Sequence, residues 1–378
     1  MNFSLQEKKA VVTGATSGIG SEIAVMLAEQ GASVAVIGRD IERGEQVAQR
    51  IRAAGGEACV LLHDVSDDKE CRMAADKAAE QLGGIDILVN CAGILTKTKI
   101  DDITREEWDK VLSTNLSGTF FMIQSCLPYL RKSEQPRIIN VSSNAGRMGG
   151  YENSQSYTAS KGGMISITMG IARQLAPENI TVNVVCPGTT ITSMGNQYSE
   201  ETLNRLIGRI PLGRLGTPRD TASAVCFFAS REAMFAWQGF GVKPDIMAMA
   251  KGIGNGIAKR FAQEGCRTII LDIDAENGKK AESELSKQGF DVRFYCIDLT
   301  NDKMVEDLFG QIAAEYGNID ILVCNAGVQI RNWATDFDMA DFDRLMSINL
   351  RAYYVCARTA ARYMKKQGGG SVVCISSV

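Results

Sequence analysis

Histidine is nearly absent from this sequence: its 378 residues contain only His63. A single imidazole excludes catalytic or metal sites that need two of them. It also argues against a serine–histidine hydrolase, because His63 lies at the end of an apolar run. Neither sign of charge predominates, since 41 Lys and Arg are balanced by 44 Asp and Glu, which gives a net charge of −3. We therefore expect no nucleic-acid partner and no attraction to an anionic membrane.

Long apolar runs are also missing. No stretch approaches the ~18 apolar residues of a membrane-spanning helix, and the N-terminus has no apolar segment behind a basic one. These absences predict a cytoplasmic protein with no membrane contact. The eleven cysteines include no CxxC pair, which favours reduced, buried thiols over disulfides or a zinc site. We predict no metal site.

Short apolar runs alternate with longer amphipathic segments along the first 230 residues. This alternation predicts an α/β fold, a Rossmann-like doubly wound parallel sheet with helices on both faces. The expected strands are 10–13, 33–37, 58–62, 85–90, 137–142 and 181–186. The expected helices are 21–30, 41–54, 67–82, 105–130 with a break near Asn115, 157–175 and 218–229.

The last third of the chain repeats the first at one constant spacing. Gly252 matches Gly18, Asp298 matches Asp64, and a second IDILV string, 319–323, matches 85–89. A period of this length is not that of a solenoid. It predicts a second, truncated Rossmann-like copy at 252–378, which contains no YxxxK motif.

A glycine-rich turn, Thr13-Gly-Ala-Thr-Ser-Gly-Ile-Gly20, follows the first expected strand and opens the first expected helix. Glycines allow close backbone approach to a pyrophosphate, and the helix N-terminus supplies free N–H groups. The next strand ends in Gly38 and Arg39. Arg39 suits the 2′-phosphate of NADP(H), so this cofactor is favoured, with NAD(H) as the alternative and a solvated surface charge as the plainer reading of Arg39.

A YxxxK motif places Tyr157 and Lys161 on one face of a helix. An adjacent ammonium stabilises a phenolate, which lets tyrosine exchange a proton at neutral pH. YxxxK alone is common, but here Asn115, Ser142-Ser143 and Pro187-Gly188 occur with it at expected strand–helix boundaries.

In this order the motifs resemble the short-chain dehydrogenase/reductase family, and residues 1–232 resemble its 3-oxoacyl-(acyl carrier protein) reductases most. The resemblance implies that Tyr157 is the acid/base, that Ser143 binds the substrate oxygen, that Lys161 lowers the tyrosine pKa and holds the nicotinamide ribose, and that Asn115 positions a water. The cofactor contacts expected from the glycine turn and the family pattern are Gly14, Thr16, Ser17, Gly18, Ile19, Gly20, Arg39, Asp64, Val65, Asn90, Ala92, Gly93, Tyr157, Lys161, Pro187, Gly188 and Thr192.

The expected activity is an NAD(P)(H)-dependent interconversion of a carbonyl and a secondary alcohol on a small molecule, of 3-oxoacyl or sugar/polyol type. Family members form dimers and tetramers, so a homo-oligomer is a further expectation. The alternative is a catalytically impaired nucleotide-binding or scaffolding chimera, because the usual last strand after residue 232 is missing from the sequence.

Residues 233–251 join the two copies and do not fit the pattern. Together with the following glycines, 234–256 resemble the lysine segment of class III aminotransferases, in which the residue matching Lys251 binds pyridoxal phosphate. The segment lacks the carboxylate and phosphate cup that this cofactor needs, so we expect no pyridoxal phosphate at Lys251. The joint also puts Ala248 at the position of Gly14 and Pro244 in the preceding strand. The second copy should not catalyse, although Asp272 and Asp298 could bind nucleotide weakly.

Overall fold

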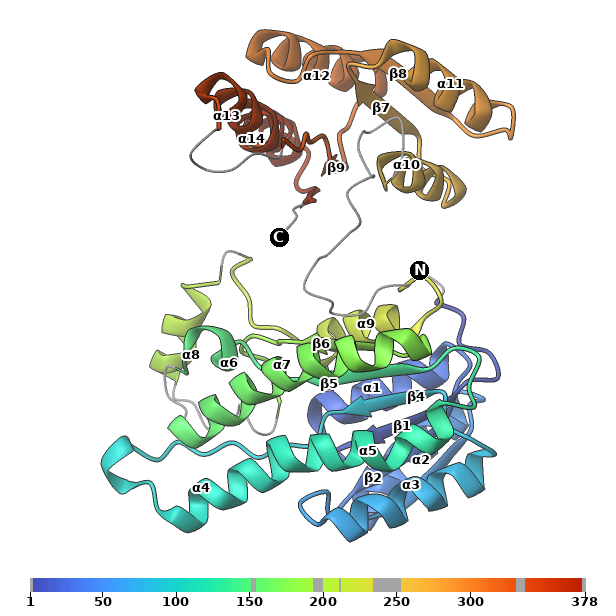
Figure 1. Cartoon of the computed structure of the whole chain (residues 1–378), viewed down its shortest axis with the longest axis vertical. Coiled ribbons are helices and arrows are strands. Elements are labelled where there is room, and N and C mark those ends of the chain that lie inside the picture. Colours follow the sequence, from blue (N-terminus) through green and yellow to red (C-terminus); the bar gives the residue numbers. More distant parts are fainter. Residues whose placement is uncertain are drawn as a thin grey trace. The chain divides into compact units, whose positions relative to one another are not determined.

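The computed structural model describes residues 3–150, 154–192, 200–210, 212–233, 253–330 and 337–375. The chain divides into two compact units, Met1–Gly239 and Phe240–Val378, called unit 1 and unit 2 below. Figure 1 labels the helices and strands of both units. Across the described ranges, no helix is both long enough and apolar enough to cross a bilayer.

Unit 1 contains a six-stranded parallel sheet with the order β3-β2-β1-β4-β5-β6. Its strands are β1 Lys9–Thr13, β2 Ser33–Gly38, β3 Ala58–Leu62, β4 Ile87–Asn90, β5 Arg137–Val141 and β6 Thr181–Val185. The winding reverses between β3 and β4, so the carboxyl ends of β1 and β4 meet at a switch point, where such sheets bind ligands. The predicted doubly wound sheet is confirmed.

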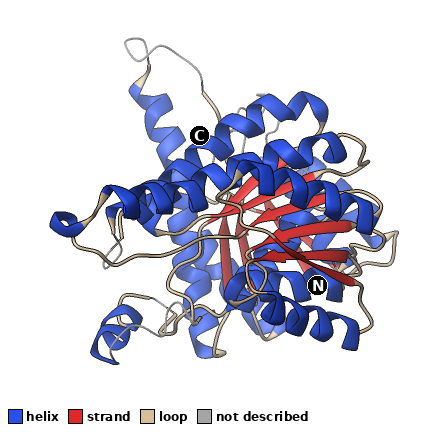
Figure 2. Ribbon diagram, turned by 90° about the horizontal axis from the view of Figure 1, so that it is seen from below, coloured by secondary structure: helices blue, strands red, loops and turns tan. Residues whose placement is uncertain are grey.

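Helices cover both faces of this sheet, as Figure 2 shows. They are α1 Gly18–Glu29, α2 Ile41–Ala53, α3 Asp68–Leu82, α4 Arg105–Leu112, α5 Gly118–Leu130, α6 Ala145–Met148, α7 Gln155–Leu175, α8 Glu200–Ile207 and α9 Pro218–Ala229. Successive residues of a strand point to opposite faces. Val12 accordingly packs with Ile23 of α1 in one core, and Val11 packs with Ala74 of α3 in the other.

The predicted break near Asn115 is a π-helical segment, Ser113–Ser117, between α4 and α5. Such segments occur as single turns inside helices, often at functional sites. Two helices were not predicted: α6, which begins two residues after Ser143, and α8. Both helices are short and are surrounded by turn-forming residues, so the sequence pattern did not reveal them. The predicted absence of a last strand concerns residues 234–252, which lie outside the described ranges.

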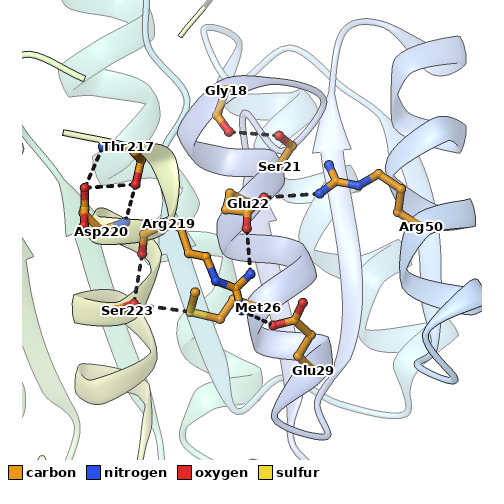
Figure 3. A network of polar contacts seen from close by, with 10 residues as sticks. All are labelled: Gly18, Ser21, Glu22, Met26, Glu29, Arg50, Thr217, Arg219, Asp220 and Ser223. Atoms are coloured by element: carbon orange, nitrogen blue, oxygen red, sulfur yellow. Dashed lines mark hydrogen bonds and ion pairs between the residues drawn. The ribbon is translucent and has the colours of Figure 1, made fainter. Parts of the chain in front are cut away.

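An ion-pair network joins α9 to α1 and α2 (Figure 3). α9 begins with a capping box in which Thr217 and Asp220 bond reciprocally. Its Arg219 donates to Glu22 at 3.0 Å and to Glu29 at 2.9 Å, and the second oxygen of Glu22 accepts from Arg50 at 3.2 Å. Arg219 thereby fixes α9 along α1, whose N-terminus forms part of the site described below.

Arg219→Met should lower the free energy of unfolding by about 1 kcal/mol, because half-exposed ion pairs contribute little singly and more as a network. The corresponding fall in the unit 1 melting temperature is roughly 2–4 °C, measured by scanning calorimetry. Arg173→Met, on an exposed position of α7, is the matched control. Equal melting of the two variants would mean that the network contributes nothing measurable.

Unit 2 repeats the middle of this pattern. Its helices are α10 Ile253–Gln263, α11 Ala275–Ser286, α12 Asp302–Tyr316, α13 Met339–Met346 and α14 Ala352–Lys366, and its strands are β7 Thr268–Asp272, β8 Val292–Cys296, β9 Ile321–Cys324 and β10 Ser371–Cys374. β7 pairs with β8 and β9 pairs with β10, both in parallel, as two separate sheets. At the constant spacing of the repeat, β7 to β10 correspond to β2 to β5, and a second π-helical segment, Ser347–Arg351, corresponds to the first.

Candidate active site

The glycine turn after β1 can be built only from glycine at two positions. Gly14 has φ +65°, and a Cβ there would lie 2.6 Å from Cα of Ala92. A Cβ on Gly20 would lie 2.2 Å from the carbonyl oxygen of Gly14. α1 begins at Gly18 with no acidic residue in its first turn, and the side chain of Ser17 makes no capping bond. The first N–H groups of α1 therefore stay available for an anion, which fits a pyrophosphate.

A cavity of about 430 Å³ lies at this turn, at the carboxyl ends of β1, β2 and β4. The predicted residues that line it are Gly14, Thr16, Ser17, Gly18, Ile19, Gly20, Arg39, Asp64, Val65, Ala92, Gly93, Tyr157, Lys161 and Thr192. Residues that were not predicted also line it: Ile37, Gly38, Asp40, Arg43, His63, Cys91, Ile94, Thr114, Val141 and Ser142. The fold thus brings most of the predicted set to one cavity.

Lys161 is the buried cation of this cavity. It is 4% exposed, and its Nζ donates to the carbonyl oxygen of Val141 at 2.8 Å. Within the described part of the chain this is its one hydrogen-bond acceptor, although an ammonium has three N–H groups to donate. Burial lowers the pKa of Lys161 to about 8. A buried ammonium with spare donors fits the hydroxyl groups of a ribose.

Tyr157 and Lys161 both come from the first two turns of α7. The hydroxyl of Ser154 caps this helix and accepts from the N–H of Tyr157. Nζ of Lys161 lies 6.0 Å from the centroid of the Tyr157 ring. Ser142, which follows β5, holds the same helix turn, because its hydroxyl donates to the carbonyl oxygen of Lys161 at 2.8 Å. The YxxxK pair therefore has the proximity that its spacing predicts.

Five predicted residues do not line the cavity. Asn90 donates to Asn140 at 2.9 Å inside the sheet, and the hydroxyl of Ser143 accepts from the N–H of Ala145 at 3.1 Å. The side-chain amide of Asn115 accepts from the N–H of Ile94 at 2.8 Å. It donates to the carbonyl oxygen of Ile94 and to the hydroxyl of Ser160. The other two residues, Pro187 and Gly188, follow β6, and the Pro187 carbonyl accepts from the N–H of Asn144. Asn115 therefore joins the loop after β4 to α7, and its role toward water stays a prediction.

Two arginines line the cavity near the end of β2, where α2 begins. Arg39 lies 3.5 Å from Asp64, and Arg43 lies 3.2 Å from Asp40. Burial opposes ionisation of Asp64, but hydrogen bonds from Ser66 together with Arg39 hold its pKa below the ordinary value. Gly38, at the end of β2, has no room for a side chain, since a Cβ there would lie 2.4 Å from Cγ2 of Thr16. An acidic side chain at that position, which would suit the ribose hydroxyls of NAD, would have to displace Thr16.

Sequence reasoning missed the role of His63. This residue is 5% exposed, and its Nδ1 lies 2.5 Å from a carboxylate oxygen of Glu70. Glu70 thus orients the ring that forms part of the cavity wall beside Asp64. The available signal was its position directly before Asp64, an expected cofactor contact.

The second copy retains some matching side chains. Asn349 bonds both backbone groups of Val328, as Asn115 does with Ile94. Asp272 accepts from the N–H of Asp274, and Asp298 accepts from Thr300. Of the positions that match the glycine turn, 247–254, residues 247–252 lie outside the described residues, and Lys251 is among them. Weak nucleotide binding by unit 2 stays a prediction.

No group of three His, Cys, Asp or Glu among the described residues could hold a metal ion.

Comparisons with known proteins identify the family of the chain. The model of the short chain dehydrogenase family matches residues 8–203 and 246–378. The chain is 38% identical over 229 residues to the 3-oxoacyl-(acyl-carrier-protein) reductase FabG of Staphylococcus aureus, an alignment that covers 60% of this chain and 93% of the relative. The FabG of Vibrio cholerae is 38% identical over 233 residues, with 62% and 94% covered.

Solved structures give the same assignment. A dehydrogenase/reductase from Sinorhizobium meliloti superposes with a TM-score of 0.60 at 36% identity, covering 62% of this chain and 92% of that one. A short chain dehydrogenase from Burkholderia cenocepacia in complex with NADP superposes with a TM-score of 0.58 at 35% identity, covering 61% and 93%. With the family model matched in both parts of the sequence, this chain belongs to the short-chain dehydrogenase family.

Proposed function

We propose that unit 1 is an NADP(H)-dependent oxidoreductase that interconverts a carbonyl compound and a secondary alcohol, with Tyr157 as the acid/base. The observation that carries the proposal is the buried ammonium of Lys161 beside the Tyr157 ring in the cavity of the glycine turn. The FabG relatives support a 3-oxoacyl thioester as the substrate class, and a sugar or polyol is the alternative class.

The chemistry of this chain's residues is a proton transfer. A bound nicotinamide dinucleotide would supply the hydride that reduces the carbonyl carbon, or accept it in the reverse direction. Tyr157 donates its phenolic proton to the oxygen of the former carbonyl, and the C=O π pair becomes the O–H bond. Lys161 stabilises the phenolate that remains, because an opposite charge favours the ionised form. Removing the Tyr157 hydroxyl or the Lys161 ammonium should therefore affect kcat more than it affects the free energy of unfolding.

The preference for NADP(H) over NAD(H) is proposed from the part of the cavity near the end of β2. Arg39 and Arg43 lie there beside Asp64 and Asp40, and β2 ends in Gly38 rather than in an acid. A guanidinium binds a phosphate through charge-assisted, forked hydrogen bonds. The solved relative with bound NADP supports the same preference.

Arg39→Ala should weaken NADPH binding about tenfold, the equivalent of ~1.4 kcal/mol, and leave NADH binding within about twofold, since only NADPH carries the 2′-phosphate. Fluorescence titration with both cofactors measures this. Arg105→Ala, an exposed arginine of α4 outside the cavity, is the matched control. Equal weakening for both cofactors would place Arg39 away from the 2′-phosphate.

The activity itself is tested with purified chain, NADPH and a 3-oxoacyl ester. We expect saturable oxidation of NADPH that depends on the ester. Saturable cofactor binding without turnover on 3-oxoacyl, sugar or polyol substrates would favour the impaired nucleotide-binding chain instead.

A further inference from the structure

Two cysteines lie side by side in the sheet of unit 2 that β9 and β10 form. Cys324 ends β9 and Cys374 ends β10, and the two residues are partners in the parallel register. The N–H of Ile375, the residue after Cys374, donates to the carbonyl oxygen of Cys324 at 2.8 Å, so main-chain bonding fixes this register. We call Cys324 and Cys374 the thiol pair.

The backbone at the thiol pair already has the separation that a disulfide needs. Neighbouring strands of a sheet lie about 4.7–4.9 Å apart, and residues in register point to the same face. A disulfide joins residues whose Cα atoms are roughly 4.4–6.8 Å apart. An S–S bond between the two strands therefore requires no large movement of the main chain.

Unit 1 shows that side chains at these two positions reach each other. By the spacing of the repeat, Cys324 matches Asn90 and Cys374 matches Asn140. Nδ2 of Asn90 donates to Oδ1 of Asn140 at 2.9 Å, across β4 and β5. Unit 2 has cysteine at both positions, so two thiols take the place of a hydrogen-bonded pair of amides.

The surroundings of the two thiols differ. Cys324 is 4% exposed, whereas Cys374 is exposed. Burial raises the pKa of the Cys324 thiol to about 12, and the neighbouring Cys374 and Cys356 add to this rise. Cys374 is also a hydrogen-bond partner of the Cys324 thiol. The thiol pair therefore combines a sulfur that an oxidant can reach with a buried sulfur in contact with it.

Two other cysteines of unit 2 lack this combination. Cys296 at the end of β8 is exposed, but its register partner on β7 is Asp272. Cys356 on α14 is buried. Within the described ranges, no cluster that includes these thiols could hold a metal ion. Oxidation is therefore the chemistry that suits the thiol pair.

We propose that the thiol pair closes to a disulfide when it reacts with a peroxide, and that this bond is a redox-sensitive clamp between β9 and β10. The clamp is a modification site of unit 2 and does not depend on the dinucleotide chemistry proposed for unit 1.

The reaction with hydrogen peroxide has two steps. The Cys374 sulfur attacks one oxygen, so that an S–O bond forms, the O–O bond breaks, and the departing hydroxide leaves with the thiol proton as water. The Cys324 sulfur then attacks the resulting sulfenic acid: the S–S bond forms, the S–O bond breaks, and a second water carries away the hydroxide and the Cys324 proton. The two thiols lose two electrons, which the peroxide gains.

The test uses the full chain, treated with hydrogen peroxide and then with an alkylating agent that blocks the remaining thiols. The monomer band of a non-reducing gel is digested with trypsin. Residues 304–331 and 367–378 are tryptic peptides that contain Cys324 and Cys374 respectively, each as its only cysteine. Mass spectrometry should find these two peptides joined, and dithiothreitol should release them.

Two variants test the place of the bond. Cys374→Ser should abolish the joined peptide, whereas Cys296→Ser, the matched control at another exposed strand-end thiol, should retain it. Oxidation should also raise the melting temperature of unit 2 by roughly 5 °C or more, because the bond closes a loop of about 50 residues. Dithiothreitol should reverse this rise, and Cys374→Ser should not show it.

Four results would overturn the proposal. They are the absence of the joined peptide after oxidation, a bond from Cys324 to Cys356 instead, a bond found only between two chains, and a joined peptide without a rise in melting temperature. If Cys374→Ser fails to fold, the peptides of the parent chain still decide, because they identify both cysteines of the bond.

Discussion

Tyr157→Phe should lower kcat for carbonyl reduction by about 1,000-fold and leave the Kd for NADPH within about threefold. The expected loss is within the usual range for removing a general acid. The phenyl ring keeps the shape of the cavity wall and removes only the hydroxyl that supplies the proton. Steady-state kinetics and a fluorescence titration of the same preparations measure the two quantities.

The matched control is Tyr129→Phe on α5. The Tyr129 hydroxyl donates to Asp76 at 2.8 Å, outside the cavity, so this variant should turn over at the parent rate. A Tyr157→Phe variant with parental kcat would remove the proposed acid from the mechanism. A variant that also lost cofactor binding would show that Tyr157 supports the cavity rather than the reaction.

Lys161→Met should lower kcat by about 100-fold or more and also weaken NADPH binding. The ammonium stabilises the phenolate, and its remaining donors fit ribose hydroxyls. Methionine keeps an unbranched apolar stem of similar length. Lys110→Met, on an exposed position of α4, is the control and should leave both quantities unchanged. An unchanged kcat in Lys161→Met would contradict the role of the buried ammonium.

The pH profile separates this role from simple packing. Burial lowers the pKa of Lys161 to about 8, so its charged form is present below that pH and is lost as pH rises through it. The kcat/KM for NADPH, which reports groups of the free enzyme, should therefore fall about tenfold per pH unit above pH ~8. Lys161→Met should lack this fall. A parent profile that is flat to pH 10 would contradict the assignment.

Much of the fold could be predicted because it rests on local patterns. Apolar strands buried on both faces, and helices with one apolar face, identify a parallel sheet at once. The π-helical segment Ser113–Ser117 was visible only as a break, because hydrogen-bond register inside a helix leaves little trace in residue type. Helices α6 and α8 are short, and short helices depend on their neighbours more than on their own propensity.

The candidate site divides in the same way. The glycine turn and the proximity of Tyr157 to Lys161 follow from backbone and helix geometry, whereas the roles of these residues were expected from the family resemblance. The close contact above Gly38 comes from Thr16, which packs over it from another loop. The pairing of His63 with Glu70 joins the end of β3 to α3. Contacts of that kind are fixed by tertiary packing, which no single stretch of sequence specifies.

The repeat was predicted from the sequence, but the pairing of the strands in the second copy was not. The spacing placed a second copy at 252–378, and the joint was recognised by Pro244 and Ala248. That β7 pairs with β8 and β9 pairs with β10 required the three-dimensional arrangement of these strands.

The most direct test of the central claim follows the hydride itself. Purified chain is incubated with a 3-oxoacyl ester and NADPH deuterated at C4 of the nicotinamide, separately for each face of the ring. We expect one of the two cofactors to yield a 3-hydroxy product that carries deuterium on the carbinol carbon, and Tyr157→Phe to yield almost none. An alcohol without deuterium from either cofactor, or no alcohol although NADPH binds saturably, would contradict the account.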